Sequence, residues 1–99
     1  MDVAALQNQI TATFSRRDRE RGVDGTFRRL VEEVGEVAKA LRGADRAALA
    51  LELSDLVAWT VSVASLCGVD LNQALDRYAH GCPRCGVSPC RCPLDSAFR

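Results

Sequence analysis

The chain has 99 residues, of which 47% are apolar and 26% are charged, and its thirteen basic residues balance its thirteen acidic ones. This length predicts one small domain, and the composition is ordinary for a globular protein. The zero net charge argues against a nucleic-acid binder that relies on a general basic surface. Because so short a chain buries only a modest fraction of its surface, we expect oligomerisation to complete its core.

The sequence shows no sign of a segment that enters or crosses a membrane. Arginines fall within the first twenty residues without a preceding apolar segment, which argues against a secretory signal. The longest uncharged run, residues 56–69, is fourteen residues long and too short to span a bilayer. We therefore expect a cytoplasmic protein with no membrane contact. Its five cysteines are then expected to be ligands or free thiols and not disulfides.

Apolar residues at helical spacing predict the first two helices, and no strand pattern competes with them. The first helix begins near Val3 and ends in a charged stretch before Gly22. The Asp-Gly-Thr sequence at 24–26 then supplies a turn and a helix start. Gly43 is the expected C-terminal stop of the second helix, whose apolar residues form one stripe.

The third and fourth helices are predicted mainly from their capping residues. Asp45 is the expected N-cap of a third helix that stops at Gly68. Asp70, with Gln73 three residues later, resembles a capping box that opens a short helix over 71–79. The predicted fold class is therefore all-α, a small bundle of about four helices whose core is completed by dimerisation.

The last nineteen residues, 81–99, hold three prolines and four cysteines and are not expected to form a regular element. We therefore predict an all-α domain over 1–80 followed by this Cys-rich tail. A Cys-Pro-x-Cys turn and a Cys-x-Cys pair place four sulfurs within eleven residues, which predicts a tetrahedral structural Zn²⁺ site. The alternative is an irregular tail with reduced thiols. The four candidate zinc ligands are Cys82, Cys85, Cys90 and Cys92.

Five acidic residues stand in two clusters, and in each cluster two carboxylates have the i, i+3 spacing of one helix face. If the two faces meet, several negative charges converge. Two unit charges ~5 Å apart repel by roughly 3 kcal/mol at an effective dielectric of 20, so a cation is needed to hold them. Oxygen-only ligands favour Mg²⁺ or Mn²⁺. The clusters are Glu32, Glu33 and Glu36 and, after fifteen residues, Glu52 and Asp55.

The place of Glu52 and Asp55 in the third helix strengthens this interpretation. That helix is apolar on most faces, which predicts burial, and buried carboxylates are rare unless they are paired or bound to a metal. The nearest preceding basic residue in the helix is Arg46, six residues before Glu52, so a local ion pair is not available. The second helix taken alone is equally compatible with a solvated acidic face.

The sequence around these carboxylates resembles a known family. The pattern Glu-Glu-x-x-Glu at 32–36, followed by Glu-x-x-Asp at 52–55, is similar to the signature of MazG-like nucleotide pyrophosphohydrolases, within the all-α NTP pyrophosphatase superfamily. A third similar stretch, Gly-Val-Asp-Leu-Asn-Gln-Ala-Leu, lies at 68–75. The resemblance covers about residues 27–78, half of the chain.

The resemblance implies an all-α homodimer or homotetramer with helices of two chains around the active site. It also implies Mg²⁺- or Mn²⁺-dependent hydrolysis of a nucleoside triphosphate to monophosphate and pyrophosphate, in a house-cleaning role on non-standard or surplus nucleotides. Metal-assisted attack of water suits such chemistry. Glu32 would orient or deprotonate the attacking water. By position, the implied metal ligands are Glu33, Glu36, Glu52 and Asp55.

The substrate-binding residues are less well specified. Many relatives carry a lysine and then an asparagine in and after the last helix, where this chain reads Arg-Tyr-Ala-His at 77–80. Arg77 and Lys39 are candidate phosphate contacts, and Trp59 is a candidate to stack on a base, with core filling as its alternative. The arginines within 16–21 are expected to form a solvated helix end. The preferred base and sugar stay open.

Two other functions fit parts of the pattern. One is a non-catalytic, zinc-tailed helical interaction module whose acidic bundle is structural or binds a cation without turnover. The other, within the same superfamily, is phosphoribosyl-ATP pyrophosphohydrolase. The complete acidic set favours a hydrolase over the interaction module, because a structural bundle has no reason to bury Glu52 and Asp55.

Overall fold

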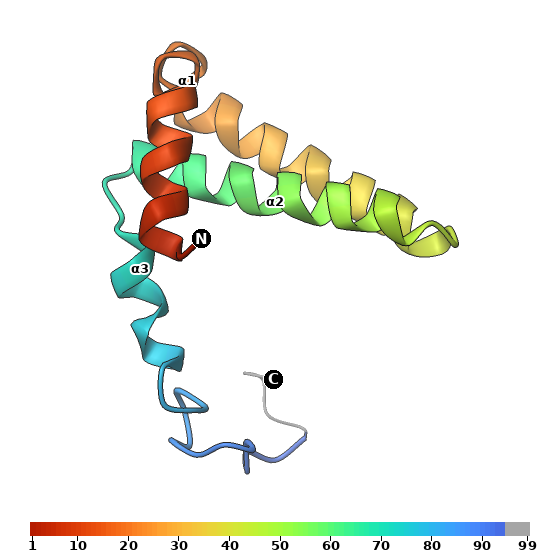
Figure 1. The fold of residues 1–99 in the computed structure, drawn as a ribbon, viewed down its shortest axis with the longest axis vertical. Helices are drawn as coiled ribbons and strands as arrows, with labels where there is room; N and C mark the ends of the chain where they lie inside the picture. The colour runs from red at the N-terminus through yellow and green to blue at the C-terminus, as the bar shows by residue number, and fades with distance from the viewer. Residues whose placement is uncertain (95–99) are drawn as a thin grey trace.

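The computed structural model describes residues 1–94, and these residues form helices and no strand. The helices are α1 (Val3–Arg42), α2 (Arg46–Leu66) and the short α3 (Leu71–Ala74), which continues into the 3₁₀ turn η1 (Leu75–Tyr78). Figure 1 shows α1 bent into two arms, with its second arm running beside α2. The predicted all-α class is confirmed.

A single glycine divides α1 into its two arms. Gly22 has φ 80° and ψ 172°, a conformation that side chains with a Cβ rarely adopt, and the helix continues on both sides of it. The predicted turn at 24–26 is therefore wrong, since the chain bends two residues earlier and residues 24–26 are already helical. The predicted end of the first helix, before Gly22, is correct, but the turn was predicted too far along the chain.

The other predicted helix ends are confirmed by their capping contacts. The Asp45 carboxylate accepts hydrogen bonds from the backbone N–H groups of Ala47 and Ala48, which starts α2. Gly68, at φ +70°, follows the end of that helix. Asp70 caps α3, but the predicted helix over 71–79 is α-helical for only four residues before it tightens into η1.

The second arm of α1 and α2 pack side by side as an antiparallel pair (Figure 1). The half-buried side chains of that arm recur three and four residues apart, which places them on the face toward α2. On α2 the half-buried positions include Glu52, Leu56, Trp59 and Val63. The corresponding positions on the arm are Leu30, Glu33, Val37 and Ala40, so one carboxylate from each helix lies on the packed face.

A polar contact fixes the first arm of α1 to the far end of α2. The Gln7 amide donates hydrogen bonds to the Ser65 hydroxyl (3.1 Å) and to the Val69 carbonyl (2.8 Å), and its oxygen accepts one from the Leu71 backbone N–H (3.0 Å). Thr11 also bonds to Ser65. These bonds hold the arm across α2, so that residues preceding Gly22 come close to the middle of that helix.

Much of the apolar surface of the helix pair is open. Among the described residues only two apolar side chains, Val61 and Ala64, are fully buried. Most of the apolar side chains of the stripe predicted for the second helix are exposed, whereas Leu30 of that stripe packs toward α2. Several leucines and valines of α2 are exposed as well, and the exposed side chains of the two helices are 43–64% accessible. They are Phe27, Val31, Val34, Leu41, Leu51, Leu53 and Val57.

By length and composition, α2 is the one helix within residues 1–94 that could cross a membrane, a test that core helices of soluble proteins also satisfy. The uncharged run considered in the sequence is shorter than this helix, which also includes Glu52 and Asp55. Both carboxylates lie near the middle of α2, where a bilayer would penalise their charges by several kcal/mol each, about 3 on insertion scales. The acidic pair is better explained by the contact with α1.

Candidate active site

Three carboxylates from the two packed helices converge at one point. One oxygen each of Glu33, Glu52 and Asp55 lies within 4.8 Å of the others. Glu33 comes from the second arm of α1, and the other two come from successive turns of α2. The i, i+3 spacing on α2 and the antiparallel packing therefore produce the acidic triad (Glu33, Glu52 and Asp55), as the sequence led us to expect.

The convergence of carboxylates is unfavourable for the ionised form of Glu33. Its Oε1 is buried and has no hydrogen-bond partner in the described structure. Contact with the Glu52 carboxyl, burial and the neighbouring negative charges raise the pKa of Glu33 to about 7. A cation bound at this point would favour the ionised carboxylate, and the proton would pass to solvent. The donor set fits a hard metal ion.

The structure does not bring the other two predicted acidic residues into the triad. Glu36 is exposed and contributes to the site through its charge, which helps to raise the Glu33 pKa. Glu32 is exposed and accepts a hydrogen bond at 3.1 Å from Arg29, one turn earlier in the same helix. Their roles as metal ligand and as water-orienting group therefore remain predictions.

A cleft of about 440 Å³ opens beside the triad, with Glu33 and Asp55 in its wall. Its other walls carry two features suited to a nucleotide, namely arginines and aromatic rings. The arginines come from the first arm of α1, which the bend at Gly22 folds back toward α2. These lining residues are Arg17 and Arg21, with Phe14 and Trp59.

Arg21 is held in this cleft by two neighbours. Its guanidinium donates a hydrogen bond at 2.9 Å to Asp18, whose side chain is almost fully buried, and it lies 5.0 Å from the centre of the Trp59 ring. The sequence did not indicate this role for Arg21, because the arginines of 16–21 were predicted to form a solvated helix end. The i, i+3 spacing of Asp18 and Arg21 was a signal for their pairing, but only the bend directs them at the triad.

Of the three predicted substrate contacts, only Trp59 lines the cleft. Its role in substrate binding stays a prediction. Lys39 is an exposed residue in the last turn of α1 and is not among the residues of the cleft. Arg77 is in η1, where its guanidinium lies 5.5 Å from the centre of the Tyr78 ring. The structure thus brings one of the three predicted contacts to the acidic triad.

A second group of possible metal ligands lies in the tail. One sulfur from each of Cys82, Cys85, Cys90 and Cys92 lies within 4.8 Å of the other three, and all four cysteines are free thiols. The fifth cysteine, Cys67, stands apart at the end of α2. Residues 95–99 of the predicted tail lie outside the described residues.

Most of the chain matches a known protein family. Residues 21–84 match the MazG nucleotide pyrophosphohydrolase domain. The matched segment is more than half of the chain and contains the acidic triad, Arg21 and Trp59. The chain belongs to the MazG nucleotide pyrophosphohydrolase family. Three of the four cysteines of the tail cluster lie beyond the matched segment.

One curated relative is a dATP/dGTP diphosphohydrolase of Cyanophage S-2L. The chain is 37% identical to it over 73 residues, which are 74% of this chain. The matched segment spans 66% of the relative's length, slightly less than two thirds. The family resemblance that the carboxylate pattern indicated is therefore confirmed.

Proposed function

We propose that this chain hydrolyses nucleoside triphosphates to nucleoside monophosphates and pyrophosphate with the aid of Mg²⁺ or Mn²⁺. The observation that carries the proposal is the convergence of Glu33, Glu52 and Asp55 at the edge of a nucleotide-sized cleft. Membership of the MazG family supports the same reaction class. A house-cleaning role, the removal of non-standard or surplus nucleotides, is the cellular use we propose for it.

The acidic triad would hold the metal. Its ligands are carboxylate oxygens, one of them buried and unpartnered, which suits a hard divalent cation. Such a metal supplies an activated water and neutralises charge on the phosphates. Two of these carboxylates are on α2 and one is on α1. The helices hold them at fixed positions, because each helix is rigid over several turns. Glu36, one turn after Glu33, is the proposed additional ligand when substrate is present.

The cleft residues provide the remaining functions. Arg17 and Arg21 line the cleft from the first arm of α1, whereas Glu33 is on the second arm, and we propose that they contact phosphate oxygens of the substrate. The Asp18 carboxylate pairs with Arg21 and so limits the rotamers of its guanidinium. We propose that Glu32 orients or deprotonates the attacking water. Its carboxylate would then have to leave its contact with Arg29 when substrate binds.

We propose purine deoxynucleoside triphosphates as the first substrates to test. The relative from Cyanophage S-2L is named for dATP and dGTP. In this chain the aromatic rings of Phe14 and Trp59 line the cleft and offer surfaces on which a base can stack. A purine presents a larger ring surface than a pyrimidine, so stacking of this kind favours it. The same cleft would have to accept a much larger molecule in a phosphoribosyl-ATP pyrophosphohydrolase.

A second copy of the chain is the proposed partner. The exposed apolar face described above leaves one copy with almost no fully buried apolar side chains. Burial of apolar surface stabilises by roughly 25 cal/mol per Å², so an interface on this face would supply what a single copy lacks. We propose a homodimer or homotetramer. Light scattering at micromolar concentration should give at least twice the chain mass, and a monomeric mass would contradict it.

The direct experiment is a panel of ribo- and deoxynucleoside triphosphates, with phosphoribosyl-ATP included, in the presence of Mg²⁺ or Mn²⁺. Pyrophosphate and orthophosphate are measured separately. We expect pyrophosphate from dATP and dGTP, loss of turnover in Glu52→Gln, and retention in the matched variant Glu20→Gln, whose carboxylate is exposed and outside the triad. Turnover of phosphoribosyl-ATP alone would reassign the substrate. No turnover across the panel would favour the interaction module.

A further inference from the structure

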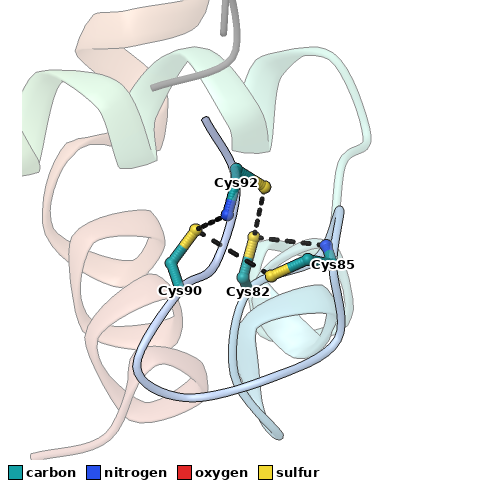
Figure 2. Close-up of side chains that lie close together, drawn as sticks. All are labelled: Cys82, Cys85, Cys90 and Cys92. Carbon is teal, nitrogen blue, oxygen red and sulfur yellow. Dashed lines mark hydrogen bonds between the residues drawn. The ribbon is translucent and has the colours of Figure 1, made fainter. Parts of the chain in front are cut away.

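The four cysteines of the tail converge without forming disulfides. The sulfur atoms of Cys82 and Cys92 are 3.8 Å apart, and those of Cys85 and Cys90 are 3.9 Å apart. A disulfide would bring two sulfurs to ~2.05 Å. Figure 2 shows the four side chains, which come from two adjacent turns of the tail, directed toward a common centre.

These separations match a tetrahedral zinc site. With Zn–S bonds of about 2.3 Å, the sulfurs at the corners of a regular tetrahedron are about 3.8 Å apart. Two sulfur pairs in the cluster have about this separation, and no pair exceeds 4.8 Å. The cluster is therefore already close to the shape that four thiolates adopt around one ion.

The backbone of the tail donates hydrogen bonds to the sulfurs. The N–H groups of Arg84 and Cys85 each donate to the Cys82 sulfur at 3.4 Å. The Arg91 N–H donates to the sulfur of Cys85 at 3.4 Å, and the Cys92 N–H donates to that of Cys90 at 3.3 Å. Such donors stabilise a thiolate more than a thiol, because they interact with the negative charge.

Two glycines allow the first turn to close. Gly86, with φ +79°, donates its N–H to the Cys82 carbonyl at 2.7 Å, and the Cys82 N–H bonds to the Val87 carbonyl at 3.0 Å. Gly81 has φ +126°, and a Cβ there would lie 2.8 Å from the Val87 carbonyl carbon. The turn is thus built to direct Cys82 and Cys85 to the same side, although the sequence spacing alone is unusually tight for a zinc ligand set.

The sulfurs lie so close together that thiolates at these positions would repel one another. A cation at the centre of the cluster would offset that repulsion.

We propose that Cys82, Cys85, Cys90 and Cys92 bind one structural Zn²⁺ ion through four thiolates. Sulfur ligands select zinc over Mg²⁺ or Mn²⁺, and four protein ligands leave no open position for substrate. The site would hold the irregular tail, which otherwise contains no regular element after η1 up to residue 94, in one conformation. This proposal is independent of the proposed hydrolase activity.

The experiment measures the zinc content of the full chain purified without chelator. We expect about one zinc ion per chain in the native chain and in the matched control Cys67→Ser, whose cysteine is outside the cluster. The double variant Cys82→Ser/Cys90→Ser lacks two of the four proposed ligands. We expect it to lose on the order of nine tenths of the zinc or more.

A second measurement does not depend on the folding of any variant. In the native zinc-loaded chain, one of the five thiols, Cys67, should react rapidly with a thiol reagent, and all five should react after removal of zinc. Replacement of zinc by Co²⁺ should give the visible absorption of a tetrahedral thiolate complex. Zinc-free native protein with five rapidly reacting thiols would overturn the proposal, as would full zinc content in the double variant.

Discussion

The acidic triad and the cysteine cluster both bring like charges together, but they do so on different supports. The triad offers three carboxylates on two long packed helices, at the edge of an open cleft. The cluster offers four thiols on irregular turns, and backbone N–H groups donate hydrogen bonds to three of its sulfurs. The two sites therefore differ both in the type and in the number of the ligands that they offer.

This difference indicates what each site can do. Four thiolates complete the coordination of zinc and leave only a structural role. Three carboxylates leave coordination positions of a hard ion open for water and phosphate oxygens. The support matters as well, since rigid helices fix the position of a reacting group, whereas turns need the ion itself to fix them. We therefore expect changes in one site to leave the other intact.

The largest expected effect comes from removing one charge of the triad. Asp55→Asn should lower kcat by about 10³-fold, equivalent to about 4 kcal/mol of transition-state stabilisation. The matched control Asp76→Asn, an exposed carboxylate in η1, should keep normal turnover. The zinc content of both variants should equal that of the native chain. Zinc loss in Asp55→Asn, or normal turnover, would contradict the separation of the two sites.

The next effect concerns the aromatic wall of the cleft. Trp59→Leu keeps an apolar side chain on the packed face but removes the ring surface, and base stacking contributes about 1–3 kcal/mol. We expect KM for dATP to rise roughly tenfold or more with kcat much less affected. Trp59→Phe should restore part of the affinity. An unchanged KM in Trp59→Leu would assign Trp59 to core filling alone.

A smaller effect is expected on stability as the pH changes. Because the Glu33 pKa is raised from 4.5 to about 7 in the folded chain, the metal-free folded state holds a proton that the unfolded state has released. Its contribution to stability is present below pH 4.5 and is lost as the pH rises through about 7. Urea unfolding of metal-free protein at several pH values should show this decline.

Two comparisons isolate Glu33 as the cause. In Glu33→Gln, the decline between pH 4.5 and about 7 should be reduced, and stability at pH 8 should exceed that of the native metal-free chain. Added Mg²⁺ should stabilise the native chain at pH 8 but not this variant. Equal stabilisation of both by Mg²⁺ would mean that the ion binds elsewhere.

The smallest expected effect is that of the cysteine cluster on hydrolysis. The double variant Cys82→Ser/Cys85→Ser should lose zinc while its kcat/KM stays within about threefold of the native value, because distant, independent sites behave additively. Far-ultraviolet circular dichroism should show that α1 and α2 persist. A loss of activity as large as that of Asp55→Asn would show that the tail supports the active site.

The sequence predicted most helix ends because the signals for them are local. Asp45 and Asp70 cap the helices they precede, and Gly68 follows the end of α2 as expected. The triad followed from i, i+3 spacing, which a helix converts directly into a shared face. The turn at Gly22 was misplaced, because several turn-forming residues lie close together there.

The rest of the site depends on contacts between distant residues. Arg21 enters the cleft because Gly22 folds one arm back and Gln7 fixes that arm to the end of α2. Neither the bend at Gly22 nor the hydrogen bonds of Gln7 can be predicted from the spacing of apolar residues in the sequence. For the same reason Lys39 and Arg77, chosen from their charge and approximate position, are not among the cleft residues. The residues that share a helix face follow from local sequence, but which faces pack against each other depends on contacts between distant residues.

The central claim, water attack at the α-phosphorus beside the acidic triad, is tested most directly by hydrolysis of dATP with Mg²⁺ in ¹⁸O-labelled water. Mass spectrometry then locates the label in the products. We predict dAMP that carries one labelled oxygen, together with unlabelled pyrophosphate, because the bond between the α-phosphorus and the bridging oxygen is broken. Label in pyrophosphate, or formation of dADP and labelled orthophosphate, would contradict the account.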